Sequence, residues 1–300
     1  VSSRDWQNVV SDPDRPLLDR TTNGLYPPGS IYKMIVAIEL LENKLVDEDW
    51  TATCTGEYEF YDRVHKCWDE NGHGVVDVES AIAQSCDVYF YEAIQKVRLN
   101  NLEKRSMDFY HGMPTGIDLP SEMKGKVPNR KYMNKLYGRY GWSTGAMLNI
   151  SIGQGEILVT PIQMAAYINI LATKGVPNKL HIVETEINED LKSISVNPKT
   201  WEIIHKSMRE VVNGKKGTGK LSNPNIPGVL VSGKTGTAEN PHGETHAWYI
   251  GFADYDSKDM ISVVVLVENG GGGGSIASPI ARKIFKKYNE SINLNIAKSQ

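Results

Sequence analysis

The sequence predicts an α+β fold, in which an antiparallel sheet is flanked by helices and accompanied by a helical lobe. Runs rich in Val, Ile and aromatic residues concentrate after residue 228, whereas apolar residues at helical spacing dominate the middle of the chain. The chain has 300 residues, 40% of them hydrophobic, so it can bury a large core. We expect one domain over residues 1–300, with a helical lobe at about 45–175 inserted and the sheet mainly at 228–268.

One buried helix is predicted near the N-terminus. Residues 1–29 are polar and rich in Pro, Asp and Arg, which predicts an extended loop. Apolar residues then recur at helical spacing from residue 30 to about residue 43: Ile31, Met34, Ile35, Ile38 and Leu41. Because this helix is apolar on most of its faces, we expect it at the centre of the domain.

The middle of the chain alternates between loops and helices. Residues 51–76 are loop-like, because they hold several glycines and most of the Cys and His residues. Thr160 and Pro161 form an N-cap and a first helical position, which predicts a helix that ends near residue 173. The other segments are predicted as helices at 78–84, 88–97 and 201–212 and as a Pro/Gly-rich loop at 112–130.

The last part of the chain predicts the sheet. Strands are expected at 229–232, 246–252 and 260–267, and a helix at 279–288. Residues Gly270 to Gly274, followed by Ser275, are the one low-complexity stretch. This stretch fits either a native turn between strand and helix or an engineered linker.

Composition and charge exclude several classes of protein. The net charge of -3 argues against a general nucleic-acid binder, which would present a basic face. The longest apolar run, at residues 261–267, is too short to cross a membrane. The chain begins at Val1 without a Met, so we expect it to be a piece of a longer protein.

The segment Ser30-Ile-Tyr-Lys33 carries a candidate nucleophile and its base. A serine hydroxyl needs a neighbouring base to take its proton, and a buried lysine near a second positive charge can serve as one. On a helix, Lys33 lies beside Ser30, and the free N–H groups of the helix N-terminus favour negative charge there. Such a pattern also occurs by chance, since Ser121-Glu-Met-Lys124 repeats it in a predicted loop.

A second candidate element, Lys234-Thr-Gly, follows a short strand. The edge of such a strand can offer backbone N–H groups to an oxyanion and to a peptide substrate. Lys234 adds the positive charge that would hold a substrate carboxylate, together with Thr235, Gly236 and Thr237 as substrate-binding residues. Taken alone, the pattern equally describes an exposed strand punctuated by glycines.

The third element, Ser85-Cys-Asp87, lies at the expected break between two helices. There Ser85 would pass a proton to the leaving amine, and Asp87 would hydrogen-bond to Lys33 or to a substrate amide. The pattern Ser-x-Asp is common, and it recurs at Ser3-Arg-Asp5 and Ser257-Lys-Asp259. Helix capping by Ser85 or Asp87 is the structural alternative.

The Cys residues suggest a metal site. Cys54, Cys67, His73 and Cys86 follow the pattern Cys-x12-Cys-x5-His-x12-Cys, and three thiolates with one imidazole would complete a closed tetrahedral zinc site. Such zinc would be structural, because four protein ligands leave no position for water. A Cys54–Cys67 disulfide and simple buried thiols remain alternatives.

Longer strings around these motifs resemble the transpeptidase domain of penicillin-binding proteins, and most closely that of the elongation-specific class B enzymes. The resemblance covers about residues 12–288. The strings are Asp14–Arg20, Tyr26–Lys33, Gly72–Gly74, Gly116–Pro120, Ile152–Glu156, Thr160–Met164 and Ser232–Glu239. The resemblance implies the penicillin-binding protein and serine β-lactamase fold and a peptidoglycan D,D-transpeptidase that needs no cofactor for catalysis.

The resemblance also assigns roles to residues. It implies that Ser30 is the acylated nucleophile and that the N–H groups of Ser30 and Thr237 form the oxyanion hole. It further implies that stem peptides are the substrates, that β-lactams acylate the enzyme, and that the full-length protein works with the cell-elongation machinery. The expected location is the periplasmic face of the inner membrane, held by an N-terminal anchor that, like the pedestal domain, is absent from this chain. Relatives of the elongation type also place metal-ligand residues near the Cys cluster.

One departure from the family pattern is that Asp87 stands where the second motif usually has Asn. Two alternatives to a transpeptidase stay open at this point. A β-lactamase or β-lactam sensor would share the fold, although no deacylation base is evident between Gly112 and Gly155. An inactive cell-wall scaffold is the other alternative, which the intact Ser30, Lys33 and Lys234 argue against.

Overall fold

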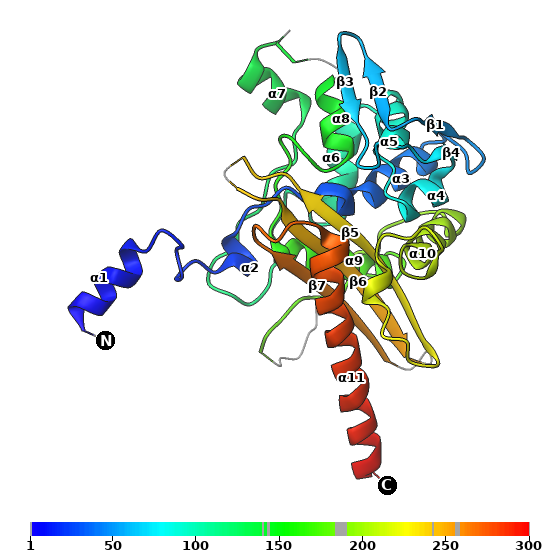
Figure 1. Cartoon of the computed structure of the whole chain (residues 1–300). Coiled ribbons are helices and arrows are strands. Elements are labelled where there is room, and N and C mark those ends of the chain that lie inside the picture. The colour runs from blue at the N-terminus through cyan, green and yellow to red at the C-terminus, as the bar shows by residue number, and fades with distance from the viewer. Residues whose placement is uncertain are drawn as a thin grey trace.

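A computed structural model describes residues 2–139, 141–142, 145–183, 191–241, 243–255 and 259–299, with side chains up to residue 293 (Figure 1). The α-helices are α1 (Ser3–Ser11), α2 (Arg20–Asn23), α3 (Lys33–Glu42), α4 (Val78–Ala83), α5 (Asp87–Ala93), α6 (Leu99–Asp108), α7 (Arg130–Tyr137), α8 (Gly145–Ser151), α9 (Pro161–Ala172), α10 (Pro198–Asn213) and α11 (Ser278–Ser299). Short helical turns are η1 (Gly29–Tyr32), η2 (Ile94–Lys96), η3 (Lys220–Ser222) and the π-helical η4 (Gly273–Ala277). The strands are β1 (Ala52–Cys54), β2 (Glu57–Phe60), β3 (Arg63–Lys66), β4 (Gly74–Val76), β5 (Val229–Ala238), β6 (His246–Tyr255) and β7 (Asp259–Val267).

The main sheet has the strand order β5-β6-β7, and both pairings are antiparallel. The central strand β6 is buried on both of its faces. Trp248, Ile250 and Phe252 pack into the main core, whereas the alternate residues Ala247 and Tyr249 pack into a second core. This period of two follows from the pleat of a strand. The α+β class, with an antiparallel sheet and a helical lobe, is therefore confirmed.

Helices cover both faces of the sheet (Figure 1). Helix α9 packs against β6 and β7 on the main-core side, and η4 and α11 pack on the opposite face, through Ala277 of η4 and through Ala281 and Phe285 of α11. The strand β5 remains at the edge of the described sheet. The lobe expected at about 45–175 thus includes one helix, α9, that lies on the sheet.

The predicted buried helix at 30–43 is confirmed as η1 followed by α3. Every side chain from Lys33 to Leu40 is buried, although the helix carries charged residues at Lys33 and Glu39. The turn η1 lies against β5 and β6, and α3 continues away from the sheet among α4, α5, α6 and α10. This helix therefore joins the sheet to the helical lobe (Figure 1).

The loops predicted at residues 1–29 and 51–76 were both wrong. Residues 1–29 contain α1 and α2, whose N-caps are the side chains of Ser2 and Asp19. Helix α1 buries no side chain and extends away from the body of the molecule, so no apolar core pattern marks it (Figure 1). Residues 51–76 form two small antiparallel sheets, β1 with β4 and β2 with β3. Their strands have only three or four residues each, too short for a clear alternation.

Three helices, α6, α7 and α8, were not predicted, and several elements extend further than expected. Helices α6 and α7 are largely polar, and α7 begins with a cap from Asn129. Strand β5 continues through the Lys234-Thr-Gly motif to Ala238, because pairing with β6 supplies partners for its polar residues. Among the described residues, no helix combines the length and apolar character that crossing a membrane requires.

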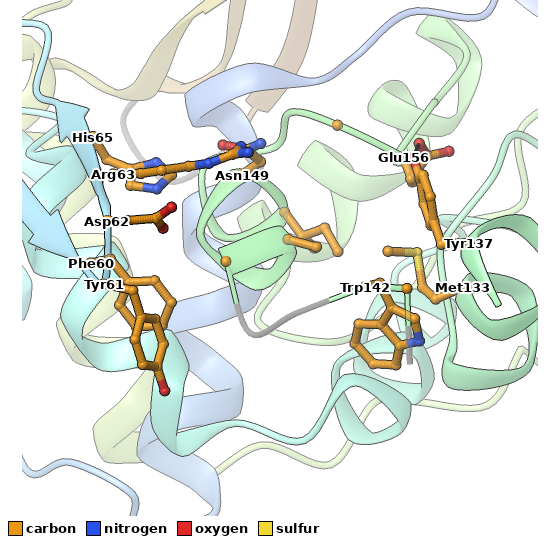
Figure 2. Close-up of a pocket in the computed structure, with 15 residues that line it drawn as sticks. Phe60, Tyr61, Asp62, Arg63, His65, Met133, Tyr137, Trp142, Asn149 and Glu156 are labelled. Carbon is orange, nitrogen blue, oxygen red and sulfur yellow. Dashed lines mark hydrogen bonds between the residues drawn. The ribbon is translucent and has the colours of Figure 1, made fainter. Parts of the chain in front are cut away.

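The β2–β3 hairpin stands opposite α7 and α8 across a cavity (Figure 2). Residues of the hairpin form one wall, and residues of the two helices with the loop after α8 form the other. The helical lobe therefore contains a cavity of its own.

Candidate active site

All three sequence motifs line one cleft of about 740 Å³ between the helical lobe and the edge strand β5. Ser30 enters from η1, Ser85 and Asp87 enter from the junction of α4 and α5, and Thr235 and Thr237 enter from β5. Segments up to about 200 residues apart in the sequence are therefore brought together. The structure thus places every predicted catalytic residue in or directly behind this cleft.

Ser30 is held against β5 by the glycine before it. Gly29 has φ of +59°, and a Cβ there would lie 2.8 Å from the carbonyl oxygen of Thr237. Only glycine allows both this backbone conformation and this approach without strain. Ser30 itself is half-buried in the first turn of η1, so its hydroxyl lines the cleft next to the edge strand.

The two motif lysines converge on Ser85. The Lys33 Nζ donates to Asp87 Oδ1 at 2.7 Å, to the Ser85 carbonyl oxygen at 2.8 Å and to Ser85 Oγ at 3.3 Å. The Lys234 Nζ donates to the same Ser85 Oγ at 2.8 Å and to the Thr235 carbonyl oxygen at 3.0 Å. One serine hydroxyl thus joins the first and third motifs.

The charge balance of this cluster differs between the two lysines. Both side chains are fully buried, but only Lys33 has a carboxylate partner. Burial, and then the positive charge of Lys33, lowers the pKa of Lys234 well below its usual value, against a smaller opposing effect of Asp87. Two amines and one carboxylate can therefore share protons around Ser85.

The backbone at Ser85 is unusual. Its φ is +58°, a left-handed conformation that non-glycine residues rarely adopt. The residue forms the break between α4 and α5 that the sequence predicted. Strained backbone of this kind persists only where the surroundings over-determine it, and here two buried lysines bond to the residue.

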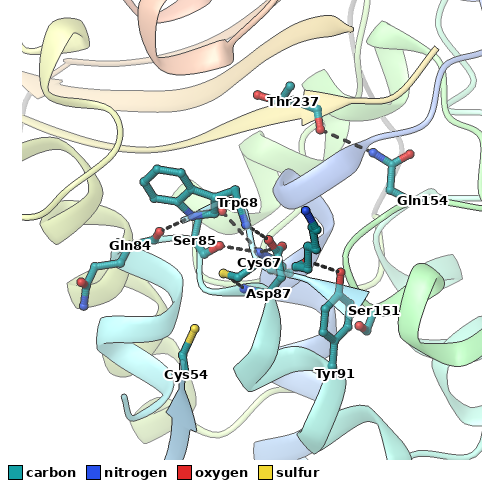
Figure 3. A network of polar contacts seen from close by, with 12 residues as sticks. Cys54, Cys67, Trp68, Gln84, Ser85, Asp87, Tyr91, Ser151, Gln154 and Thr237 are labelled. Carbon is teal, nitrogen blue, oxygen red and sulfur yellow. Dashed lines mark hydrogen bonds and ion pairs between the residues drawn. The ribbon is translucent and has the colours of Figure 1, made fainter. Parts of the chain in front are cut away.

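Asp87 uses both of its carboxylate oxygens as acceptors. Oδ1 accepts from Lys33, and Oδ2 accepts from the backbone N–H of Trp68 at 3.0 Å. Figure 3 shows Asp87 next to Cys67 and Trp68. An aspartate satisfies this position because both donors need an acceptor, which gives a physical reason for the departure from Asn.

Several cleft residues were not identified from the sequence. Thr218 shares a hydrogen bond with Thr235 between their hydroxyl oxygens at 2.7 Å. Gln154 donates to the Thr237 carbonyl oxygen at 3.5 Å across the cleft (Figure 3). The N–H of Gly273 donates to Thr237 Oγ1 at 3.3 Å. The string that contains Gln154 was noticed, but nothing in it indicated a contact with β5.

The glycine-rich stretch packs closely against the motif strand. A Cβ on Gly273 would lie 2.3 Å from the carbonyl oxygens of both Gly236 and Trp248. Gly272, Gly274 and Ser275 also line the cleft. The stretch therefore behaves as a fitted turn that leads into η4, rather than as a free linker.

The chance copies of the motifs lie elsewhere. Ser121 is exposed and hydrogen-bonds to Asn23, and it does not line the cleft. Asp5 belongs to the exposed helix α1, and Asp259 is an exposed residue at the start of β7. The three candidate motifs differ from these copies in position, because they lie on η1, at the junction of α4 and α5, and on β5, where they line one cleft.

Cys54, Cys67, His73 and Cys86 form one compact cluster beneath the second motif. One ligand atom from each lies within 4.8 Å of all the others, and the Nδ1 of His73 is 3.5 Å from the sulfurs of both Cys54 and Cys67. Zinc–ligand bonds of about 2.0–2.3 Å in a tetrahedron place ligand atoms roughly 3.5–3.8 Å apart. The residues therefore fit a zinc ion.

The cluster is directly connected to the active site. All three cysteines are free and buried, and the N–H of Asp87 donates to Cys67 Sγ at 3.4 Å. A hydrogen bond from the Cys86 thiol lowers the pKa of Cys67. The buried Nε2 of His73 has no partner in the described chain. The Cys54–Cys67 disulfide considered from the sequence is not formed in this structure.

Comparison with known proteins agrees with this geometry. The family model described as the penicillin binding protein transpeptidase domain matches residues 2–286. The peptidoglycan D,D-transpeptidase MrdA of Haemophilus influenzae is 33% identical over 315 residues, which cover 96% of this chain and 48% of that protein. The chain thus spans about half the length of this relative.

Solved structures give the same result. A crystal structure of Pseudomonas aeruginosa PBP2 in complex with WCK 5153 superposes with a TM-score of 0.87 at 31% identity, covering 96% of this chain and 64% of that one. The PBP2 of Helicobacter pylori in complex with MreC gives a TM-score of 0.84 at 32% identity, covering 95% of this chain and 54% of that one. The chain therefore belongs to the family of penicillin-binding protein transpeptidase domains.

Proposed function

We propose that this chain is the catalytic domain of a peptidoglycan D,D-transpeptidase of the elongation type. The observation that carries the proposal is the convergence of Lys33 and Lys234 on the Ser85 hydroxyl, in the cleft that Ser30 lines. A nucleophile, two buried amines and a strand edge are the parts that acyl transfer from a peptide needs. In this proposal residues 1–300 form one domain, with a helical lobe inserted before the sheet.

The first half of the reaction acylates Ser30. The Lys33 ammonium first passes a proton through Ser85 Oγ to the Lys234 amine, because both nitrogens contact that hydroxyl. Ser30 Oγ then attacks the carbonyl carbon of the penultimate D-Ala, and the Lys33 amine takes the hydroxyl proton. The N–H groups of Ser30 and Thr237 receive the developing oxyanion. Thr235 and Thr237 lie on the same face of β5 and line the cleft, so they bind the terminal carboxylate beside the charge of Lys234.

In the second half of the reaction, the leaving group departs and the acceptor amine takes its place. The C–N bond breaks, and the terminal D-Ala departs with a proton delivered through Ser85, whose hydroxyl lies between the two lysine amines. An amine of a neighbouring stem peptide attacks the acyl carbon, gives up a proton along the same path and releases Ser30 Oγ. A β-lactam acylates Ser30 in the same way but leaves no site for the acceptor.

Intact-protein mass spectrometry after incubation with a β-lactam tests this proposal. We expect one stable adduct on the wild type and none on Ser30→Ala. Ser121→Ala is the matched control, because Ser121 also stands in a Ser-x-x-Lys pattern, and it should form the adduct normally. An adduct that survives Ser30→Ala would overturn the mechanism, and rapid return of the wild type to its native mass would indicate a β-lactamase instead.

We further propose that the Cys cluster holds a structural zinc ion. The ligands would be Cys54, Cys67, Cys86 and the Nδ1 of His73. The ion would only cross-link the segments that carry these residues, because four protein ligands leave no open position on it. The cluster ties β1, the end of β3, the start of β4 and the N-terminus of α5 together. It thereby fixes the segment that presents Ser85 and Asp87.

Metal analysis of protein purified without chelator tests this site. We expect about one zinc per chain in the wild type and much less in His73→Ala. His65→Ala is the control, because His65 lies on the neighbouring strand β3 but outside the cluster. Absence of zinc from the wild type, or a Cys54–Cys67 disulfide in the purified protein, would refute the assignment.

Partners and location follow by similarity. A solved complex of the Helicobacter pylori relative contains MreC, so we propose that the full-length protein also associates with the cell-elongation machinery. Stem peptides of peptidoglycan lie outside the cytoplasm, so we place the domain at the periplasmic face of the inner membrane. Protease accessibility in intact spheroplasts would test this location.

A further inference from the structure

The cysteine cluster and the catalytic cleft share a wall. Of the four residues proposed to bind zinc, all in the described chain, only Cys67 is part of the cleft lining, which also contains Ser30 and Asp87. Its side chain is almost wholly buried, at 3% exposure. Buried thiols are ordinarily inert, because reagents do not reach them. Its place in the lining makes Cys67 the member of the cluster that a small reagent can reach from the cleft.

A second thiol is in position to react with Cys67. The Cys86 thiol hydrogen-bonds to the Cys67 sulfur, and Cys86 is fully buried. The ligand atoms of the cluster all lie within 4.8 Å of one another, and all three cysteines are free. The sulfur of Cys54 contacts the Nδ1 of His73 at 3.5 Å. We therefore expect Cys86, rather than Cys54, to pair with Cys67 on oxidation.

Both sulfurs lie next to the groups that hold the catalytic aspartate. Trp68 follows Cys67 and donates its N–H to Asp87 Oδ2 at 3.0 Å (Figure 3). Asp87 follows Cys86 and donates its own N–H to Cys67 Sγ at 3.4 Å. A covalent bond between the two sulfurs requires them to be closer than in a non-bonded contact. Its formation would therefore shift Trp68 relative to Asp87, and with Asp87 the carboxylate that holds Lys33.

We propose that Cys67 is an oxidation site in the wall of the catalytic cleft, and that a peroxide joins it to Cys86 and thereby switches off acylation of Ser30. The Cys67 sulfur first bonds to one oxygen of hydrogen peroxide as the O–O bond breaks, which gives a sulfenic acid and water. The Cys86 thiol then attacks that sulfur, and hydroxide leaves and takes the thiol proton as a second water. Two thiols and one peroxide thus give one disulfide and two waters. For thiolates bound to zinc, the two protons come from solvent.

This inference rests on the proposed transpeptidase and on the proposed zinc site, and it adds a redox control to both. The disulfide takes two of the four proposed zinc ligands, so oxidation should release the ion. Thiol–disulfide exchange with a reductant restores both thiols, so the control is reversible. The proposed periplasmic location is an oxidising compartment, in which disulfides form and persist.

Peroxide treatment of the purified wild type tests the proposal by three measurements. Peptide mass spectrometry should find a Cys67–Cys86 disulfide, and a chromogenic chelator should detect about one zinc released per chain. Stopped-flow acylation of Ser30 by a β-lactam should slow about tenfold or more, because small displacements of catalytic groups are costly. Dithiothreitol followed by zinc should restore the rate.

Two carboxylate variants form a matched pair. Aspartate also binds zinc, so Cys67→Asp and Cys54→Asp each keep four ligands and lose one thiol. Each variant is compared with its own untreated form. Peroxide should leave the acylation rate of Cys67→Asp unchanged, whereas Cys54→Asp keeps both reacting thiols and should slow about as much as the wild type. An equal loss of rate in Cys67→Asp would trace the effect to other residues, such as methionines, and overturn the proposal. The disulfide map of the wild type decides the same question if a variant does not fold.

The route through the cleft has its own test. A β-lactam already bound to Ser30 fills the cleft, so it should slow formation of the disulfide several-fold. Equal rates of disulfide formation with and without the β-lactam would refute attack from the cleft at Cys67.

The outcomes keep the three proposals apart. Absence of an adduct on the untreated wild type refutes the transpeptidase, and absence of zinc from it refutes the metal site. A normal adduct without a Cys67–Cys86 disulfide after peroxide, or an unchanged acylation rate once that disulfide has formed, refutes the redox control. If peroxide instead yields a Cys54–Cys67 disulfide and Cys54→Asp becomes insensitive, our pairing is wrong.

Discussion

Replacing Asp87 by Asn should destabilise this protein, although Asn is the usual residue of the motif in the family. The two oxygens of Asp87 accept from two donors, the Lys33 ammonium at 2.7 Å and the Trp68 N–H at 3.0 Å. An asparagine offers one acceptor oxygen and one NH₂ group, so in either orientation one donor faces another donor. Lys33 is fully buried and has no other carboxylate within salt-bridge distance in the described chain.

The size of the effect follows from these contacts. Turning a hydrogen bond to a charged group into a neutral one loses roughly 1 kcal/mol, and leaving one buried donor unsatisfied costs about 1–3 kcal/mol more. The side chain of Asp87 is only 11% exposed, so water replaces little of this loss. We expect the free energy of unfolding to fall by about 2–4 kcal/mol.

Urea denaturation followed by tryptophan fluorescence measures this change. Asp259→Asn is the matched control, because Asp259 is itself exposed and ends a Ser-x-Asp pattern in the sequence, so it should change stability by less than about 0.5 kcal/mol. Acylation by a β-lactam should also slow in Asp87→Asn, since Lys33 and Ser85 lose their fixed positions. An unfolding free energy for Asp87→Asn within 0.5 kcal/mol of the wild type would refute the two-acceptor argument.

Three further predictions concern buried groups around the cleft and in the core. Burial lowers the pKa of Lys234, so this lysine binds more protons in the unfolded chain than in the folded one. The difference in unfolding free energy between the wild type and Lys234→Met, measured by chemical denaturation, should therefore shift in favour of the wild type as the pH rises toward 10, by at most about 1.4 kcal/mol per pH unit. Burial lowers the pKa of His111 to about 4, against a smaller effect of its bond to Phe109. As the pH falls from 6.5 to 4, this histidine should therefore lower the free energy of unfolding by about 3 kcal/mol. His111→Phe should flatten that part of the curve of unfolding free energy against pH, and an unchanged curve would show that another group causes the loss. Gly29→Ala would place a Cβ 2.8 Å from the Thr237 carbonyl oxygen at a φ of +59°, so stopped-flow acylation should slow at least tenfold, and a rate equal to that of the wild type would contradict the proposed close approach.

Periodic apolar patterns and local motifs were the features that sequence reasoning used well. The helix through Lys33 was predicted because its apolar residues recur at helical spacing, and the strand that leads to Lys234 was predicted because it begins with a run of Val and Leu. The Cys-x12-Cys-x5-His-x12-Cys pattern was predicted as a cluster because thiolates and imidazole share one preferred metal. Elements without such a pattern, among them α1 and α7, were missed, since exposed polar helices depend on capping and on tertiary context.

The sequence by itself determined which residue types this chemistry has available: a serine and a lysine one helical turn apart, a second lysine on a strand, and four metal-ligand side chains. Only the tertiary structure decided how they meet. It placed both lysines on the hydroxyl of Ser85, turned the two oxygens of Asp87 toward different donors, and opened a second cavity next to the cleft. The physical reason is that local propensity depends on neighbours in the chain. Hydrogen bonds between residues more than 50 positions apart depend instead on how the lobe packs against the sheet.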